Sequence, residues 1–185
     1  MMQKKVQIIS DGSLDLSQEL TKEKDIEVVP FYVSFDSETY QKEMVKVGVR
    51  EFYQEMVDHP TVFPKTSMPS VHDYYEVFEK HAKEKMPVIC ICITRKFSGS
   101  LQSATTAKDM ILEEYPDAQI TVIDSTVNTV LQGLYVLEAC RLRDMGLEYQ
   151  QIVDALLPIR ETGRIFFTIG SIDYLKHGGR IGRLA

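Results

Sequence analysis

The feature that most constrains the fold of this chain is the alternation of short apolar runs with amphipathic patterns. Val88–Ile93 is a run of six apolar residues, which is typical of a strand covered on both faces. Before and after this run, apolar residues recur at the i, i+3, i+4 spacing of one helix face. Strands that alternate with helices indicate βαβ units. The sequence therefore predicts an α/β fold with an open, mainly parallel sheet flanked by helices.

The other predicted elements follow the same alternation along the chain. Strands are predicted at Lys4–Ser10, Ile120–Ile123 and Ile165–Ile169, with a further extended region at Ile26–Phe35. Helices are predicted where apolar residues recur, at Val49–Met56, Val71–Ala82, Ala104–Ile111, Val127–Leu134 and Tyr149–Leu156. Ser70 is predicted to cap the second of these helices, because Asp73 follows three residues later, as in a capping box.

The length of 185 residues accommodates one domain, or one domain and the opening of a second. We expect residues 1–162 to form the α/β domain and residues 163–185 to begin a smaller one. The final segment, Gly178–Ala185, opens with a double glycine, a turn that usually leads into another element. We therefore expect the chain to be truncated within its second domain.

Charge and hydropathy argue against several classes of protein. The chain has 21 Lys and Arg residues and 27 Asp and Glu residues, which gives a net charge of −6. Proteins that bind nucleic acids instead gather Lys and Arg against the phosphates. The apolar runs are far shorter than the roughly 20 residues of a membrane span. The residues up to Asp11 contain no apolar signal-peptide core. We expect a cytoplasmic protein that binds no nucleic acid and spans no membrane; transient contact with a membrane surface stays open.

The three cysteines indicate neither a disulfide framework nor a metal site. Cys90 and Cys92 lie in the apolar run, and no second cysteine pair or nearby histidine completes four ligands. We expect them to be core residues in a reducing compartment, with no bound metal. Of the histidines, His177 lies beside the double glycine near a plausible site, and His59, His72 and His81 are expected at the surface.

Four segments rich in hydroxyl groups stand at informative positions. Ser10–Ser13, Ser98–Ser100 and Asp124–Thr126 each follow a predicted strand, and Thr66–Ser70 precedes a predicted helix. The carboxyl ends of parallel strands meet at one edge of a sheet, and ligands bind there where the strand order reverses. We therefore expect the first three segments to lie close together, and the fourth is a candidate to join them.

Each segment also has a purely structural interpretation. Ser98–Ser100 is equally compatible with an anion seat at a helix N-terminus and with a helix cap. Pro69 and Ser70 are sufficient to fix a helix start. Asp11 lacks the second nearby carboxylate that would support a phospho-acceptor or metal site, and Asp124 is typical of an Asx turn.

Several common catalytic motifs do not occur in the sequence: the P-loop, the dinucleotide-binding fingerprint and the serine hydrolase elbow. Hydroxyl groups orient one small polar head, whereas phosphate chains usually recruit Lys and Arg. The residues alone therefore favour a pocket for a single carboxylate or carbonyl group on an apolar ligand.

Five segments, taken in order, resemble the motifs of the DegV family. They are Asp11–Leu16, Thr66–Ser70, Lys96–Ala104, Asp124–Ser125 and Tyr174–Ile181. Each is short, but together they span essentially the whole chain, which makes the resemblance specific. It implies an α/β domain with a mainly parallel sheet, followed by a smaller α/β domain.

The resemblance implies a fatty-acid-binding protein and not an enzyme. In the family, a long-chain fatty acid lies between or beneath the two domains, with its tail in an apolar tunnel. Bacterial members that serve fatty acid kinase present the bound carboxylate to the separate catalytic subunit, which forms acyl phosphate with ATP. The resemblance thus implies no cofactor, a fatty acid as ligand and the kinase subunit as partner.

The family's binding residues carry over to particular positions of this chain. Thr66 and Ser98 match the Thr and Ser that bind the carboxylate, Ser67 flanks the head group, and Gly99 offers a backbone N–H. Arg180 matches an arginine near the pocket mouth and the partner surface. Five further residues are expected to support the binding residues without contacting the ligand: Asp11, Ser13, Asp124, Ser125 and His177.

The chain departs from the family pattern at three places. Met68 stands where the family usually has Gln, which removes a polar arm, and Ser100 stands where it has Thr, which keeps a hydroxyl. The chain also ends before a family His that helps to hold the head group. We therefore expect this chain to bind fatty acid weakly, or only as an oligomer.

Two other classes of function stay as alternatives. One is a small-molecule kinase or phosphotransferase-type enzyme subunit of related α/β fold, which rests on fold analogy alone. The other is a structural or regulatory partner with an empty pocket. Purification with bound lipid would separate the carrier from both.

Overall fold

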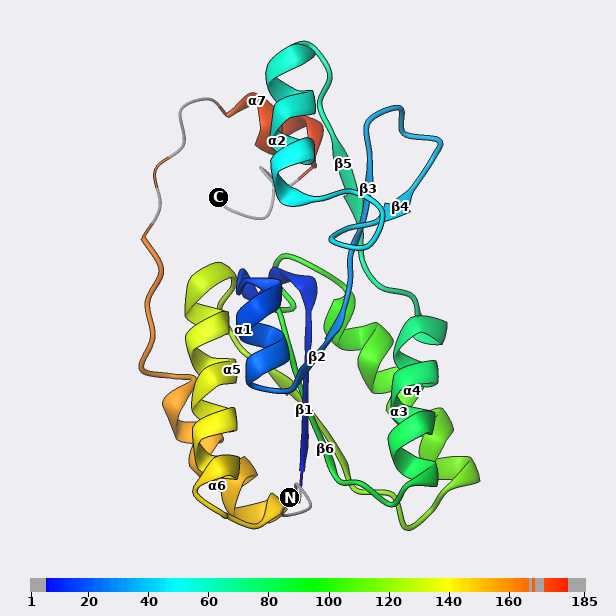
Figure 1. Ribbon diagram of the computed structural model, residues 1–185, viewed down its shortest axis with the longest axis vertical. Coiled ribbons are helices and arrows are strands. Elements are labelled where there is room, and N and C mark those ends of the chain that lie inside the picture. Colours follow the sequence, from blue (N-terminus) through cyan, green and yellow to red (C-terminus); the bar gives the residue numbers. More distant parts are fainter. Residues whose placement is uncertain (1–5, 167, 169–171, 180–185) are drawn as a thin grey trace. The chain divides into compact units, whose positions relative to one another are not determined.

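Figure 1 shows the computed structural model of the chain, which describes residues 6–166, 168 and 172–179. The chain forms two compact units: Met1–Val29 with Ser70–Ile165, and Pro30–Pro69 with Phe166–Ala185. The sequence-based division into residues 1–162 and 163–185 does not separate residues 30–69 from the first unit. The chain passes between the units three times, at Val29–Pro30, Pro69–Ser70 and Ile165–Phe166. The first two crossings lie at a proline, and a single proline is a weak boundary signal.

The first unit contains a four-stranded sheet in which every pair of neighbouring strands is parallel. Its order is β2 (Ile26–Val29), β1 (Gln7–Asp11), β6 (Val88–Cys92) and β7 (Ile120–Asp124). Its helices are α1 (Gln18–Glu23), α3 (Val71–Lys83), α4 (Ser100–Glu114), α5 (Thr129–Asp144) and α6 (Tyr149–Ile159), with a 3-10 turn, η1, at Gly12–Leu14. The predicted α/β fold with a mainly parallel sheet is confirmed.

Alternation along the strands builds one apolar core on each face of this sheet. Ile8 packs in a core with residues of α5 and α6, and its neighbour Ile9 packs in a core with α3 and α4. Figure 1 accordingly shows α3 and α4 on one side of the sheet and α5 and α6 on the other. Cys90 and Cys92 are fully buried in the second core with free thiols, which confirms the prediction that they are core residues.

The start of α3 follows the predicted capping box. The Ser70 side chain accepts a hydrogen bond from the Asp73 N–H at 3.1 Å, and the Asp73 carboxylate accepts one from the Ser70 N–H at 2.8 Å. Two donors at the helix start are thereby satisfied. Ser70 is therefore a structural residue that fixes where α3 begins.

Two element predictions differ from the structure. The predicted helix from Val127 begins at Thr129, because Val127 is used in a turn: its carbonyl accepts the Thr94 N–H at 3.0 Å. Of the predicted strand 165–169, residues 165, 166 and 168 are not in a strand, and 167 and 169 lie outside the described residues. Phe166 is 93% exposed. An apolar run becomes a strand only where a neighbouring strand pairs with it.

His81 was expected at the surface, and this prediction is wrong. It lies on the inner face of α3, where its Nε2 is 2.6 Å from the Glu27 carboxylate on β2. Lys80 contacts the same carboxylate at 3.1 Å. Burial alone would raise the pKa of Glu27, but the hydrogen bonds from His81 and Lys80 outweigh it and lower that pKa below its ordinary value of 4.5.

This lowered pKa predicts a pH-dependent contribution to stability. A carboxylate with a depressed folded-state pKa stabilises fully above its ordinary pKa, and the contribution is lost as pH falls through the folded value. Glu27→Gln should therefore lower the free energy of unfolding by about 1 kcal/mol near pH 7. Urea unfolding at pH 7 and at a series of pH values below 4.5 should show this difference shrink as the Glu27 carboxylate becomes protonated. An equal difference at all of these pH values would contradict the assignment.

In its described residues, the second unit contains a small antiparallel sheet and two helices. The sheet has the order β4 (Gln41–Lys42), β3 (Tyr32–Ser34) and β5 (Lys65–Ser67). The helices are α2 (Val49–Asp58), which confirms the prediction at 49–56, and α7 (Asp173–His177). The sequence predicted neither β4 nor β5, because both are very short and consist of polar residues.

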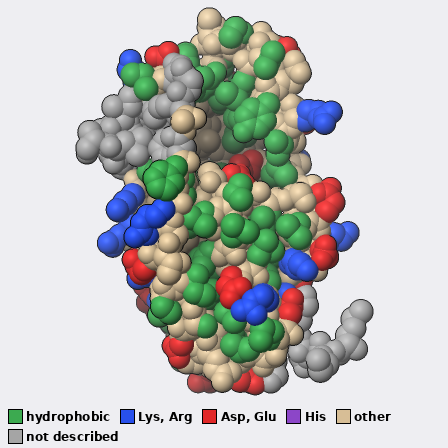
Figure 2. Space-filling model, turned by 90° about the vertical axis from the view of Figure 1, so that its left-hand side faces the viewer, with side chains coloured by type: hydrophobic (Ala, Val, Ile, Leu, Met, Phe, Trp, Pro, Cys, Tyr) green, Lys and Arg blue, Asp and Glu red, His purple; other side chains and the backbone are tan. Residues whose placement is uncertain are grey.

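The face of the first unit that carries α5 and α6 exposes apolar side chains. Figure 2 shows hydrophobic groups gathered on this face. Val130 and Leu134, one turn apart on α5, are 58% and 55% exposed, and Leu157 on α6 is also exposed.

None of the helices in the described part of the chain combines the length and hydropathy that crossing a membrane requires.

Candidate functional site

Asp11 occupies the point where the strand order of the sheet reverses. It is the last residue of β1, which lies between β2 and β6. The chain passes from β1 to β2 on one side, and the next strand of this sheet, β6, lies on the other side of β1. In open parallel sheets, ligands bind outside the carboxyl ends of the strands at such a reversal. Asp11 therefore marks the position where a binding site is expected.

The Asp11 carboxylate is fully buried and joins the loops that leave two neighbouring strands. Its Oδ2 accepts hydrogen bonds from the Ile93 N–H at 2.9 Å and from the Ser100 hydroxyl at 2.6 Å, both beyond the end of β6. Its Oδ1 accepts from the Ser13 N–H at 3.3 Å, across the turn that follows β1. Such satisfaction by several donors is what a buried carboxylate needs.

Gln132 from α5 completes this network, although no motif in the sequence pointed to this residue. Its side chain is fully buried, and its Nε2 donates to Asp11 Oδ1 at 2.9 Å and to Ser10 Oγ at 3.1 Å. The Ser13 hydroxyl lies 2.7 Å from Asp11 Oδ1 and 2.6 Å from Gln132 Oε1. Ser13 and Asp11 thus connect β1 to α5, so the structure brings these two predicted residues together.

The segment Ser98–Ser100 leads from β6 into α4. Gly99 is the N-cap residue, so the cap residue itself offers no side chain to the helix start. Ser98 Oγ accepts the Ser100 N–H at 3.2 Å, and both Ser98 and Gly99 are partly exposed. Ser100 is fully buried, and its hydroxyl is bonded to Asp11. The exposed part of this segment therefore offers one hydroxyl beside the N-terminus of a 15-residue helix.

Asp124 and Ser125 form the turn at the end of β7. The Asp124 carboxylate accepts the Thr126 N–H at 2.9 Å, as in an Asx turn. Ser125 is fully buried; its N–H donates to the Cys92 carbonyl at 3.0 Å and its hydroxyl to the Val127 carbonyl at 2.9 Å. The three segments expected at the carboxyl edge thus do meet there. In this turn both side chains are used to hold the backbone.

Thr66 and Ser67 lie in the second unit, on strand β5. Thr66 pairs with Val33 and Ser67 with Tyr32 of β3, and both hydroxyl-bearing residues are exposed. Met68, which directly follows the strand, is also exposed. These side chains are therefore accessible on an antiparallel strand, which is a different setting from the helix start that holds Ser98.

His177 also belongs to the second unit, where it ends α7. Its ring stacks on Phe63, with the ring centroids 3.8 Å apart, and its Nδ1 lies 2.8 Å from the Asp173 carbonyl. Tyr174 meets the same Phe63 edge-on at 5.0 Å. His177 thus packs against an aromatic side chain. Arg180, the other candidate in this motif, lies outside the described residues.

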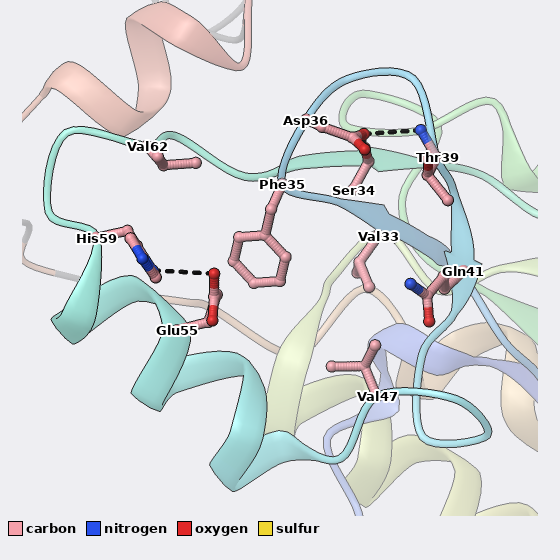
Figure 3. Close-up of a pocket in the computed structure, with 10 residues that line it drawn as sticks. All are labelled: Val33, Ser34, Phe35, Asp36, Thr39, Gln41, Val47, Glu55, His59 and Val62. Atoms are coloured by element: carbon pink, nitrogen blue, oxygen red, sulfur yellow. Dashed lines mark hydrogen bonds and ion pairs between the residues drawn. The ribbon is translucent and has the colours of Figure 1, made fainter.

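The second unit also contains a pocket of about 320 Å³ beside β3 (Figure 3). Val33, Phe35 and Val62 contribute apolar wall, and the Glu55–His59 pair, with Glu55 Oε1 2.9 Å from His59 Nδ1, stands at one end. Among the residues that the structure describes, none of the candidate binding residues predicted from the sequence lines this pocket. The remaining lining residues are Ser34, Asp36, Thr39, Gln41 and Val47.

The residues that the structure describes include no group of three or more His, Cys, Asp or Glu side chains that could hold a metal ion. The Asp11 carboxylate in particular is surrounded by hydrogen-bond donors, which would repel a cation. The chemistry at the carboxyl edge is therefore that of hydroxyl groups and amides.

Comparison with known proteins identifies the family of this chain. The model of the DegV family, described as "Uncharacterised protein, DegV family", matches residues 5–185. The chain belongs to the DegV family. A DegV domain-containing protein of Clostridium perfringens is 31% identical to it over 180 residues, which are 97% of this chain and 62% of that protein. The chain thus spans less than two thirds of the length of this relative.

Solved DegV structures share the fold and bind fatty acids. A stearic acid-binding protein from Eubacterium ventriosum is 48% identical, with a TM-score of 0.92 over 97% of this chain and 61% of that one. A fatty-acid-binding DegV family protein from Thermus thermophilus is 29% identical, with a TM-score of 0.81 over 96% of this chain and 61% of that one. Fatty acids are therefore the ligands of these structural neighbours.

Proposed function

We propose that this protein binds a long-chain fatty acid and holds its carboxylate with hydroxyl groups and backbone amides. The observation that carries the proposal is the N-terminus of α4 at the strand reversal, where the cap residue is a glycine and both Ser98 and Gly99 are partly exposed. Helix N-termini favour negative charge and supply unpaired N–H groups. The fatty acids bound by its structural neighbours fit this chemistry.

The remaining roles follow from the family resemblance. Thr66 is the second hydroxyl for the carboxylate and Ser67 flanks it; both residues are exposed. Arg180 acts at the mouth of the site or on the partner surface. His177 has a supporting role at the head group, and Asp11, Ser13, Asp124 and Ser125 support the site by fixing the loops at the carboxyl edge of the sheet.

The protein acts, on this proposal, as a carrier and not as an enzyme. It presents the bound carboxylate to a separate fatty acid kinase in the cytoplasm, and that subunit makes acyl phosphate. The hydrogen bonds of Asp11 support a role as carrier. A buried carboxylate that already accepts hydrogen bonds from Ile93, Ser100 and Gln132 is poorly suited to be a phospho-acceptor or a metal ligand.

Removal of either proposed carboxylate ligand tests this function. Ser98→Ala and Thr66→Ala should each weaken fatty acid binding by about 1–3 kcal/mol, because each removes a hydrogen bond to a charged group. Displacement of a fluorescent fatty acid measures both affinities. Thr106→Ala, further along α4, and Thr61→Ala, an exposed residue of the second unit, are the matched controls. Unchanged affinity in both test variants would place the head group elsewhere.

A further inference from the structure

The segment Ser98–Ser100 is anchored from the protein interior by two further side chains. The Ser100 hydroxyl donates to Asp11 Oδ2 at 2.6 Å, and the Tyr74 hydroxyl lies 2.6 Å from the same Ser100 oxygen. A serine hydroxyl carries a single proton. Since that proton goes to Asp11, the Tyr74 hydroxyl donates to Ser100. The relay therefore runs from Tyr74 through Ser100 to Asp11.

This relay determines where the Ser98 hydroxyl stands. The Ser100 N–H donates to Ser98 Oγ at 3.2 Å, so a displacement of Ser100 also displaces the Ser98 side chain. Ser98 Oγ accepts this bond, and its own proton stays available to donate to a ligand. No described residue accepts that proton. Ser98 is thus oriented as a donor, which is the role that a carboxylate requires.

The relay is sealed from solvent. Tyr74, Ser100 and Asp11 each have no exposed surface, so water does not replace a link that is removed. Burial, followed by the nearby Cys92 and Asp11, raises the pKa of Tyr74 well above its ordinary value of 10.0, so its hydroxyl stays protonated as a donor. The ligand does not reach the Ser100 hydroxyl either, since that group is used internally.

We propose that Tyr74 is a positioning residue for carboxylate recognition: through Ser100 and Asp11, its hydroxyl holds Ser98 in the orientation that donates to a bound carboxylate. Tyr74 does not touch the ligand. This inference rests on the proposed function, and it assigns part of the head-group selectivity to a tyrosine of α3 that packs in the core.

The test compares head-group selectivity in Tyr74→Phe and Tyr135→Phe. Tyr135 is the matched control, because it is also buried and its hydroxyl donates to the Leu156 carbonyl at 2.8 Å, outside the relay. For each full chain, affinities are measured for a fatty acid and for the fatty alcohol of the same chain length, which shares the tail but lacks the charge. General destabilisation of the protein weakens the binding of both ligands by the same factor. A disturbed head-group site instead lowers the ratio of the affinity for the acid to the affinity for the alcohol.

We expect Tyr74→Phe to lower the preference for the acid over the alcohol by about fivefold, the equivalent of one hydrogen bond. Tyr135→Phe should leave the ratio unchanged. If Tyr74→Phe does not fold, Ser100→Ala and Ser100→Thr replace it: the first should lower the ratio and the second, which keeps the hydroxyl, should restore it.

The outcomes separate this inference from the proposed function. If Ser98→Ala lowers the ratio but Tyr74→Phe behaves like Tyr135→Phe, the positioning role is overturned and the fatty acid site stands. If the unmodified chain shows no preference for the acid and Ser98→Ala changes nothing, the proposed function fails, and the role of Tyr74 fails with it.

Discussion

Asp11→Ala should lower the free energy of unfolding by about 3–5 kcal/mol, the largest effect expected of any single substitution here. The carboxylate is fully buried, and its removal leaves the Ser100 hydroxyl, the Gln132 amide and the Ile93 N–H without their acceptor. Each of these donors is at the junction of β1, β6 and α5. Urea unfolding measures the loss, and fatty acid binding should fall together with stability.

The matched control for this substitution is Asp109→Ala. Asp109 is an exposed carboxylate on α4, and its ion pair with Lys108 at 3.3 Å is at the surface. Its replacement should change the free energy of unfolding by no more than about 0.5 kcal/mol. If Asp11→Ala were as mild as this control, the hydrogen bonds around Asp11 would not be what joins the three elements.

Gly133→Ala is expected to destabilise the protein by about 2 kcal/mol, although alanine is the better helix former. A Cβ at this position of α5 would lie 2.4 Å from the Leu14 carbonyl oxygen and 2.8 Å from Leu16 Cδ2. The first contact is with backbone, so η1 or α5 must move. Because η1 directly follows Asp11, the same movement disturbs the carboxyl edge, and the affinity for fatty acid should fall as well.

Gly163→Ala provides the comparison for this prediction. A Cβ at Gly163 would lie 2.9 Å from Leu131 Cδ2, the end of a flexible side chain that can rotate away. Its cost should stay within about 0.5 kcal/mol. Equal unfolding free energies for the two glycine variants in urea would show that the close approach of α5 to η1 is not a constraint.

The sequence predicted the parts of the fold in which hydropathy follows a regular period. Val88–Ile93 predicted a strand covered on both faces, and β6 is fully buried. The small sheet of the second unit was not predicted, because Lys65–Ser67 and Gln41–Lys42 are polar and have no period to detect. Pairing with β3 makes them strands, and that pairing is a property of the tertiary structure.

The sequence pattern predicts the helix α5 correctly but indicates the wrong side of it as the buried face. The apolar pattern of Val130, Leu131 and Leu134 predicts a helix that buries those residues, yet Val130 and Leu134 are exposed. The buried face instead carries Gln132 and Val136. An isolated glutamine in line with buried positions is a signal of a buried polar contact, but it becomes visible only once the helix face is known.

The sequence also predicted part of the candidate site, namely the segments that follow the strands. Ser10–Ser13, Ser98–Ser100 and Asp124–Ser125 meet at the carboxyl edge because the βαβ pattern predicts parallel strands, and the carboxyl ends of parallel strands lie at one edge of a sheet. Tyr74 had no distinguishing signal, since its position on α3 fits an ordinary core aromatic. Its hydroxyl acquires a role only because Ser100, 26 residues away in sequence, comes within 2.6 Å.

Native mass spectrometry of the purified chain tests the central claim most directly, because it reads the protein and any bound small molecule together. The account predicts a population whose added mass equals that of a long-chain fatty acid, and it predicts that Ser98→Ala loses this mass at a lower activation energy. A protein that carries no added mass, and that still binds none after incubation with fatty acid, would contradict the account.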